Sequence, residues 1–289
     1  MRVVLTGASG LIGSRLGAAL SSRGDEVVAL GRQSGWDPAS GPAPAGLLTG
    51  ADAVVHLAGE NIAQRWSAAV KERIRTSRTT GTANLVAGIA AAEPRPRALL
   101  CANAVGYYGN RGDELLSEQS PAGEDWLAGV CAAWQEAAMR AGEVGARVCV
   151  LRTGVVLDRH GGALAKMLPP FQSGVGGPVA GGRQFMSWIH LDDLVALYIA
   201  AIDDDRYAGP LNAVAPEAVR NADFSRALGH ALHRPAFAPV PALALRMLFG
   251  EMAQIVTDSQ NVAPRRLGEL GFAYAHPELG AALADALSR

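Results

Sequence analysis

The stretch that decides the fold is RVVLTGASGLIGSRL, residues 2–16. An apolar, β-branched run comes first, followed by the glycines Gly7, Gly10 and Gly13 and then by apolar residues at helical spacing. A strand that passes through a glycine turn into a helix lets backbone N–H groups approach a pyrophosphate, and the helix N-terminus adds the positive end of its dipole. The stretch therefore predicts a dinucleotide-binding turn, with an ordinary strand-to-helix turn as the alternative.

Strand-like and helix-like segments alternate along residues 1–155. After the glycine turn, we expect strands at 26–30, 53–57, 98–102 and 147–152, and helices at 67–92 and 124–142. Alternation of this kind predicts an α/β fold with a Rossmann-type, doubly wound parallel sheet.

The pattern changes after residue 155. Residues 158–184 are rich in glycine and proline, and only a short helix is expected there, at 163–168. A strand at 187–190, a helix at 192–201 and a strand at 210–214 follow. We expect three parts: residues 1–155 as the dinucleotide-binding domain, 156–220 as partly interleaved substrate-binding or lid segments, and 221–289 as a small helical C-terminal domain.

The composition limits the classes of function. The 289 residues include 26 Lys+Arg and 27 Asp+Glu, with 49% hydrophobic residues, so neither a disordered chain nor a basic nucleic-acid-binding surface is expected. No apolar run is long enough for a membrane span. Cys101, Cys131 and Cys149 fit neither a disulfide framework nor a zinc site, so we expect no metal and a reducing cytoplasm. The expected partner is a small-molecule substrate.

The residue that closes the second strand indicates which dinucleotide is bound. An Asp or Glu at this place would bond the ribose 2′-hydroxyl, whereas a basic residue accommodates a 2′-phosphate. The sequence has Arg32 after Gly31 and no acid. The charge favours NADP(H) over NAD(H), with a solvated surface arginine as the alternative.

Several strings resemble the extended short-chain dehydrogenase/reductase superfamily: TGASGLIG at 6–13, HLAG at 56–59 and YYG at 107–109. Longer strings resemble one atypical branch of it, an epimerase-like family of the NAD-dependent epimerase/dehydratase type with a small C-terminal domain. These strings are LAGENIA at 57–63, TSR at 76–78, LRTGVVL at 151–157, KMLPPF at 166–171, GGRQFMSWIHLDD at 181–193 and ALGHALHRP at 227–235.

The resemblance implies a set of cofactor-binding residues. Arg32 would take the 2′-phosphate, and Arg78, with Thr153 and Gly154, would lie near the cofactor. The pyrophosphate would rest on the glycine turn, and the turn after the third strand would line the side from adenine to ribose. These two turns contribute Gly7, Ser9, Gly10, Leu11, Ile12 and Gly13, and Leu57, Ala58 and Gly59.

The same resemblance shows what is missing. Hydride transfer in the superfamily uses a tyrosine, a lysine four residues later and a serine. The expected helix at 124–142 contains neither tyrosine nor lysine, and Asn103 stands where the serine is usual. Without the lysine, no obvious neighbour lowers the pKa of a tyrosine toward neutrality. Any catalysis must therefore use another acid or base.

We take the substitutes from the cleft segments. Tyr108 and His190 are the expected catalytic groups, with Asn103 as an orienting donor. Each has a structural alternative: a core tyrosine, and a helix start in which Asp192 or Asp193 is the cap and His190 merely packs. The expected substrate-binding residues are Glu60, Tyr107, Lys166, Arg183, Gln184 and Trp188.

Taken together, the residues and the resemblance favour an NADP(H)-binding epimerase or oxidoreductase that acts on a small molecule, a nucleotide-linked one included. The alternative is a non-catalytic NADP(H)-binding sensor or scaffold. The missing Tyr/Lys pair favours the sensor, and the polar cluster from Arg183 to His190 favours the enzyme.

Overall fold

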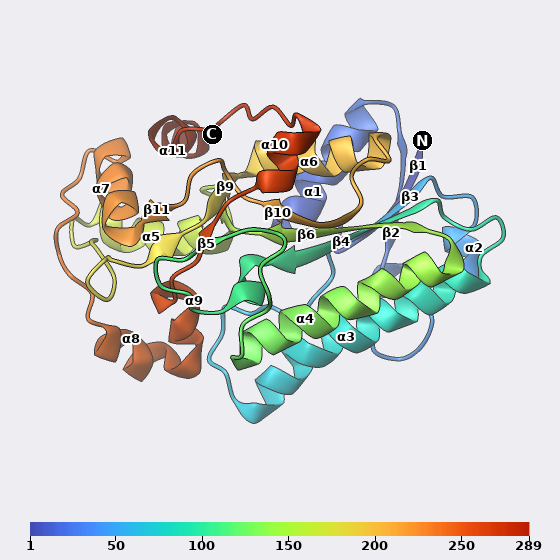
Figure 1. Cartoon of the computed structure of the whole chain (residues 1–289), viewed down its shortest axis with the longest axis horizontal. Helices are drawn as coiled ribbons and strands as arrows, with labels where there is room; N and C mark the ends of the chain where they lie inside the picture. Colours follow the sequence, from blue (N-terminus) through green and yellow to red (C-terminus); the bar gives the residue numbers. More distant parts are fainter. Residues whose placement is uncertain (289) are drawn as a thin grey trace.

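The computed structural model describes residues 1–288, and a six-stranded parallel sheet lies at its centre (Figure 1). Its strands are β1 (Arg2–Thr6), β2 (Glu26–Leu30), β3 (Ala53–His56), β4 (Ala98–Ala104), β6 (Arg147–Thr153) and β10 (Gly209–Ala213). They lie in the order β10-β6-β4-β3-β1-β2. The chain leaves β1 for β2 on one side and returns to β3 on the other, so the strand order reverses between the carboxyl ends of β1 and β3. Open α/β sheets bind their ligands at such a point.

Helices cover both faces of the sheet, because successive strand residues point to opposite sides. Val3 and Leu5 pack with α1 (Leu11–Ser22) and α6 (Leu191–Asp203) in one core. Val4 packs on the other face in a second core, which includes α3 (Ala68–Ala91), α4 (Trp126–Met139) and the short α2 (Ala45–Leu48). Figure 1 shows the two pairs of long helices on either side of the sheet. The Rossmann-type α/β fold is confirmed.

The two long helices of the second layer lie close to their predicted positions. Helix α3 begins after Ser67, whose side chain accepts a hydrogen bond from the Val70 N–H. Helix α4 begins after Asp125, which accepts from the Ala128 N–H, and its last turn tightens into the 3₁₀ segment η3 (Arg140–Val144). Two more 3₁₀ segments follow strand ends: η1 (Arg32–Ser34) after β2, and η2 (Val105–Tyr108) after β4.

The middle of the chain contains more regular structure than its glycine and proline content predicts. Helix α5 (Gly162–Gln172) continues through Pro169 and Pro170, beyond the expected 163–168. Leu164, Leu168 and Phe171 lie on one buried side of this helix, and we infer that their burial outweighs the two lost N–H donors. Strand β7 (Val155–Leu157) pairs with β9 (Trp188–His190), and β8 (Phe185–Met186) pairs with β11 (Val219–Arg220).

Strand β10 returns to the central sheet from within residues 156–220, so this part of the chain is interleaved with the first 155 residues. The C-terminal region is mostly helical, with α7 (Asn221–Ala231), α8 (Ala242–Phe249), η4 (Gly250–Ala253), α9 (Gln254–Thr257), α10 (Arg265–Leu270) and α11 (Leu279–Ser288). Its strand β12 (Asn261–Val262) pairs with β5 (Leu115–Leu116). The predicted boundaries at 155 and 220 stay predictions. Within residues 1–288, no helix is both long and apolar enough to cross a membrane.

Candidate cofactor site and active site

The three glycines of the turn after β1 have different surroundings. Gly7 has a φ of +70°, and a Cβ there would lie 2.8 Å from the carbonyl carbon of Leu57. A Cβ on Gly13 would lie 2.2 Å from the Gly7 oxygen. A Cβ on Gly10 would meet only the Gly7 oxygen, at 3.3 Å, and otherwise open space. Packing of the turn thus requires Gly7 and Gly13, whereas Gly10 faces outward, where a ligand can approach the backbone.

The helix that follows the turn has an open N-terminus. Gly10 is its N-cap, no side chain caps it, and its first turn contains no acidic residue. Ser9 and Gly10 are exposed, and Leu11 and Ile12 are half-buried. The first N–H groups of a helix have no partner inside it, so they and the helix dipole favour an anion here. The glycine turn therefore fits a pyrophosphate.

A chain of three buried side chains joins the ends of β1 and β3 below the turn. The Thr6 hydroxyl oxygen accepts from the N–H groups of Leu57 and Ala58, each at 3.2 Å, so its own proton points to His56 Nδ1 at 2.7 Å. His56 Nε2 then carries the ring proton and donates it to the Thr82 hydroxyl at 3.0 Å. Burial, with a smaller contribution from the charge of Arg78, lowers the pKa of His56 to about 4. The neutral imidazole thus fixes the Leu57–Ala58 turn against β1.

Two arginines lie along this edge. Arg32 opens η1 directly after β2, and its side chain is 82% exposed, with Asp37 at 3.9 Å. Arg78 comes from α3 and is mostly covered: its Nη1 donates to the carbonyl oxygens of Glu60 and Ile74, and its guanidinium lies 5.0 Å from the ring centre of Trp134. A Cβ on Gly59 would lie 3.3 Å from the Arg78 guanidinium carbon. One arginine is presented to solvent, and the other is held beneath the turn after β3.

Helix α4, on which the resemblance places the superfamily's tyrosine and lysine, contributes apolar contacts here instead. Leu127 and Cys131, one turn apart on α4, face Gly106, and a Cβ on Gly106 would lie 3.1 Å from Leu127 and 3.7 Å from the Cys131 sulfur. Asn103 Nδ2 donates to the Cys131 carbonyl oxygen at 2.9 Å. Burial raises the pKa of the Cys131 thiol to about 12, so it is inert near neutral pH. Cys131 is thus a free, buried cysteine of the core.

Tyr108 belongs to a buried polar network. Its hydroxyl donates to Asn212 Oδ1 at 2.6 Å and accepts from Arg152 Nη1 at 2.8 Å. The Arg152 guanidinium also donates to Gln135 and stacks on the Tyr107 ring, 3.5 Å from its centre. Tyr108 is fully buried, and burial raises the pKa of its hydroxyl. This position fits the alternative of a core tyrosine. The catalytic role of Tyr108 stays a prediction, and the burial of the hydroxyl disfavours it.

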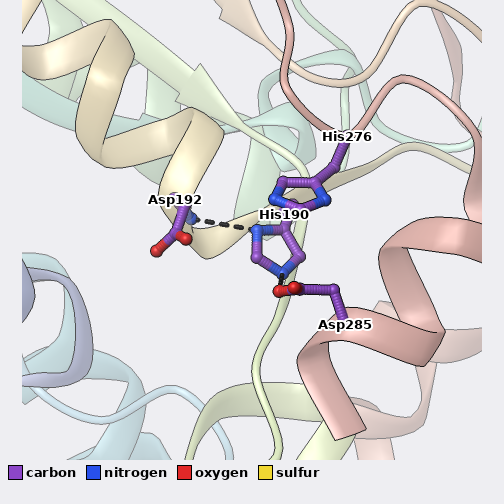
Figure 2. Close-up of side chains that lie close together, drawn as sticks. All are labelled: His190, Asp192, His276 and Asp285. Atoms are coloured by element: carbon purple, nitrogen blue, oxygen red, sulfur yellow. Dashed lines mark hydrogen bonds and ion pairs between the residues drawn. The ribbon is translucent and has the colours of Figure 1, made fainter. Parts of the chain in front are cut away.

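His190 lies at the start of α6 and caps that helix itself (Figure 2). Its Nδ1 accepts from the Asp192 N–H at 3.2 Å, so the expectation that Asp192 or Asp193 is the cap is wrong. The reason is that β9 runs directly into α6, which leaves His190 extended at the N-cap position. The Asp193 carboxylate accepts instead from the N–H groups of Ala275 and His276.

The neighbours of His190 come from the C-terminal region. Its ring stacks on His276 with 3.9 Å between ring centres, and its Nε2 lies 3.2 Å from Asp285 Oδ2 (Figure 2). Donor atoms of His190, Asp192, His276 and Asp285 lie within 4.8 Å of one another. Because Nδ1 accepts the capping bond, the ring proton is on Nε2, which leaves His190 no lone pair for a metal. Its catalytic role stays a prediction, disfavoured by its 1% exposure.

Two further segments lie across the carboxyl edge near the glycine turn. Lys166 Nζ donates to the Ala63 carbonyl oxygen at 3.1 Å, and a Cβ on Gly161 would lie 3.0 Å from the Leu11 side chain. Residues 161–166 thus span from the glycine turn to the loop after β3. In that loop, a hydrogen bond from Gln64, together with the nearby Arg73, lowers the pKa of Glu60. Glu60 is therefore a carboxylate at neutral pH.

The remaining predicted substrate residues lie apart from one another. Arg183 and Gln184 line a pocket of about 680 Å³ with Asp113, Arg220 and Ser259. The Gln184 amide donates to the backbone oxygens of Val179 and Val256. Trp188 is 1% exposed and packs in the core with Phe171 and Phe224. The structure brings Glu60 and Lys166 to the edge near the glycine turn, but not Trp188.

Comparison with known proteins decides the family. Residues 3–213 match the NAD dependent epimerase/dehydratase family, and residues 240–286 match a domain of unknown function, DUF1731. The chain belongs to the NAD dependent epimerase/dehydratase family. The resemblance read from the sequence strings is thereby confirmed. Over 296 residues, the chain is 42% identical to the epimerase family protein Mb2239 of Mycobacterium bovis, covering 99% of this chain and 98% of that protein.

Solved structures of this epimerase family agree with the fold. The human epimerase family protein SDR39U1 (isoform 2), crystallised with NADPH, matches with a TM-score of 0.93 at 36% identity, covering 100% of both chains. A nucleoside-diphosphate sugar epimerase from Corynebacterium glutamicum matches with a TM-score of 0.82 at 37% identity, covering 99% of this chain and 58% of that chain.

Some polar residues of this epimerase-family chain were missed by sequence reasoning. They are His56 and Thr82 below the glycine turn, and Arg152, Gln135 and Asn212 around Tyr108. A signal existed for two of them, because His56 and Arg152 stand at the ends of otherwise apolar strands. A buried charge or imidazole in such a strand needs partners, but the sequence does not name them.

Proposed function

We propose that this epimerase-family protein binds NADP(H) at the carboxyl edge between β2 and β4. The observation that carries the proposal is the open N-terminus of α1, reached through the outward-facing Gly10 at the point where the strand order reverses. The NADPH in the crystals of the human relative supports it. NAD(H) is the weaker alternative, because Arg32 rather than an acid follows β2.

Each part of the dinucleotide has a proposed contact. Residues 7–13 hold the pyrophosphate, Leu57 to Gly59 line the adenosine side, Arg32 takes the 2′-phosphate, and Arg78 lies nearby. When bound, NADPH would supply a hydride. The chain's own residues bind and orient the cofactor and cover the edge with the segment that carries Lys166.

We propose further that the protein acts as an epimerase or oxidoreductase on a small molecule. Glu60, Lys166 and Tyr107 are the candidate substrate contacts at this edge, and Arg183 and Gln184 are candidates in the separate pocket. One observation favours the non-catalytic alternative: the polar groups of Tyr108 and Asn103 already hold bonds inside the protein. We also propose that the protein is located in a reducing cytoplasm, since all three cysteines are free and buried.

Calorimetric titration of NADPH and NADH tests the cofactor. Charge-assisted hydrogen bonds contribute roughly 1.5 to 3 kcal/mol, so Arg32→Ala should weaken NADPH binding about tenfold to a hundredfold and leave NADH binding unchanged. Arg97→Ala is the matched control, because Arg97 is another exposed arginine paired with an aspartate but lies at the amino edge of the sheet. Equal affinity of the wild type for the two cofactors would contradict NADP(H) preference.

A turnover screen separates the enzyme from the sensor. NADPH oxidation is followed by absorbance with carbonyl compounds and sugar nucleotides as substrates. Turnover that Lys166→Met reduces, with NADPH affinity preserved, supports the enzyme and the proposed edge. Tight NADPH binding without turnover on any substrate class supports the sensor.

A further inference from the structure

Arg78 is a positive charge held inside the protein without a carboxylate bound to it. Its two hydrogen bonds go to backbone oxygens, and within residues 1–288 its guanidinium forms no ion pair. Burial lowers its pKa from the ordinary value, but an arginine stays protonated in proteins. Glu60 has its carboxylate in contact with Gln64 and Arg73 instead. The Glu60 charge acts on Arg78 from nearby but forms no ion pair with it, so the Arg78 guanidinium lies near the edge of the sheet without a bonded carboxylate.

The strand order indicates which half of a dinucleotide would meet this charge. Arg32 follows β2, and the glycine turn follows β1, so the adenosine half would lie over β2 and the pyrophosphate over β1. The nicotinamide half would then extend the other way, past β3 toward β4. The Arg78 guanidinium lies against Gly59, which follows β3, and its charge acts on Cys131, which is bonded to Asn103 at the end of β4. Arg78 thus lies between the ends of β3 and β4.

Of the two arginines whose charge acts on Cys131, Arg152 is already bonded to Tyr108 and Gln135, which leaves Arg78. Helix α4 contains no lysine or arginine, and the Cys131 thiol is neutral near pH 7 because burial raises its pKa to about 12. Since the site is covered by protein, solvent and salt screen a charge there only weakly. NADPH has a neutral nicotinamide ring, whereas the ring of NADP⁺ is positively charged. The two forms share every other group.

We propose that Arg78 sets a preference for the reduced cofactor, so that the protein binds NADPH more tightly than NADP⁺. This inference rests on the proposed cofactor function. Repulsion between the guanidinium and the charged ring acts only on the oxidised form. The protein would accordingly hold its cofactor ready to donate a hydride rather than to accept one.

The ratio of the two dissociation constants tests this inference without requiring a substrate. We expect wild-type protein to bind NADPH about tenfold more tightly than NADP⁺, a difference of about 1.4 kcal/mol. Arg78→Gln should bring the ratio within about twofold of one, and Arg78→Lys should keep most of it. The matched control is Arg75→Gln, which removes an exposed arginine from the same helix and should leave the ratio unchanged.

The outcomes separate the inference from the function on which it rests. Wild-type protein that binds neither form would refute the cofactor function itself. Binding of both forms with equal affinity in the wild type would refute only the role of Arg78, whether or not Arg78→Gln folds. A ratio that persists in a folded Arg78→Gln protein, checked by circular dichroism, would also refute it.

Discussion

The two halves of the carboxyl edge differ in how they are built. At the ends of β1 and β3, the surface is backbone: an open helix N-terminus, an outward Gly10 and a turn held by Thr6 and His56. At the ends of β4 and β6, the space is filled by side chains, in which Arg152 and Tyr108 hold each other inside the protein. The first half retains what dinucleotide binding requires, and the second lacks the superfamily's proton relay. The two halves of one edge thus differ in which features of the superfamily they keep.

The largest expected effect comes from the half of the edge at the ends of β1 and β3. Gly10→Val should weaken NADPH binding at least about a hundredfold, since a side chain there stands between the ligand and the N–H groups. Its unfolding temperature should stay near that of the wild type, because the added Cβ meets only one atom, at 3.3 Å. Calorimetry and thermal unfolding measure the two properties.

Gly13→Val is the matched comparison for Gly10→Val. Its Cβ would lie 2.2 Å from the Gly7 oxygen, so both the fold and the binding should suffer, with an overpacking cost of about 3 kcal/mol. If Gly10→Val binds NADPH like the wild type, the glycine turn is not the pyrophosphate site.

Substitutions in the half at the ends of β4 and β6 should change the free energy of unfolding rather than cofactor binding. Arg152→Met leaves Tyr108 and Gln135 without their donor and should reduce the free energy of unfolding by about 3 kcal/mol. NADPH affinity should remain within about threefold of the wild type, since no cofactor contact is proposed for Arg152, Tyr108 or Gln135. Arg147→Met, on the same strand, loses an ion pair with the exposed Asp205 and a hydrogen bond to the Tyr207 carbonyl oxygen and should cost about 1 kcal/mol. Urea unfolding that shows equal losses for the two variants would break the contrast.

The smallest effect is a pH dependence from His56. Its pKa is about 4 in the folded protein and 6.5 in the unfolded chain, so the unfolded state takes up the proton first as the pH falls. The stability from the neutral imidazole is present above pH 6.5 and should decrease by about 2 kcal/mol between pH 6.5 and about pH 4.5. Urea unfolding across this range measures it.

His56→Gln is the control for this dependence, because the amide does not titrate. The slope of stability against pH should decrease in the variant, whatever its absolute stability. Asp258, whose pKa burial raises to about 6, acts in the opposite direction in both proteins and cancels in the difference. Identical slopes for the two proteins would show that His56 is not a buried neutral imidazole.

The sequence by itself determined the fold, the family and the missing catalytic pair. The glycine turn at 7–13 and the alternation of strands and helices depend on local backbone geometry and on side-chain periodicity, which neighbouring residues specify. The absence of tyrosine and lysine from α4 can be read directly.

Only the tertiary structure decided which polar groups are available. Tyr108 reaches Asn212 across 104 residues, His190 meets His276 and Asp285 of the C-terminal region, and Arg78 comes to lie against Gly59. Whether a hydroxyl, an imidazole or a guanidinium faces a ligand or a buried partner depends on contacts between distant segments. A local pattern does not contain those contacts, because they form only when the layers pack.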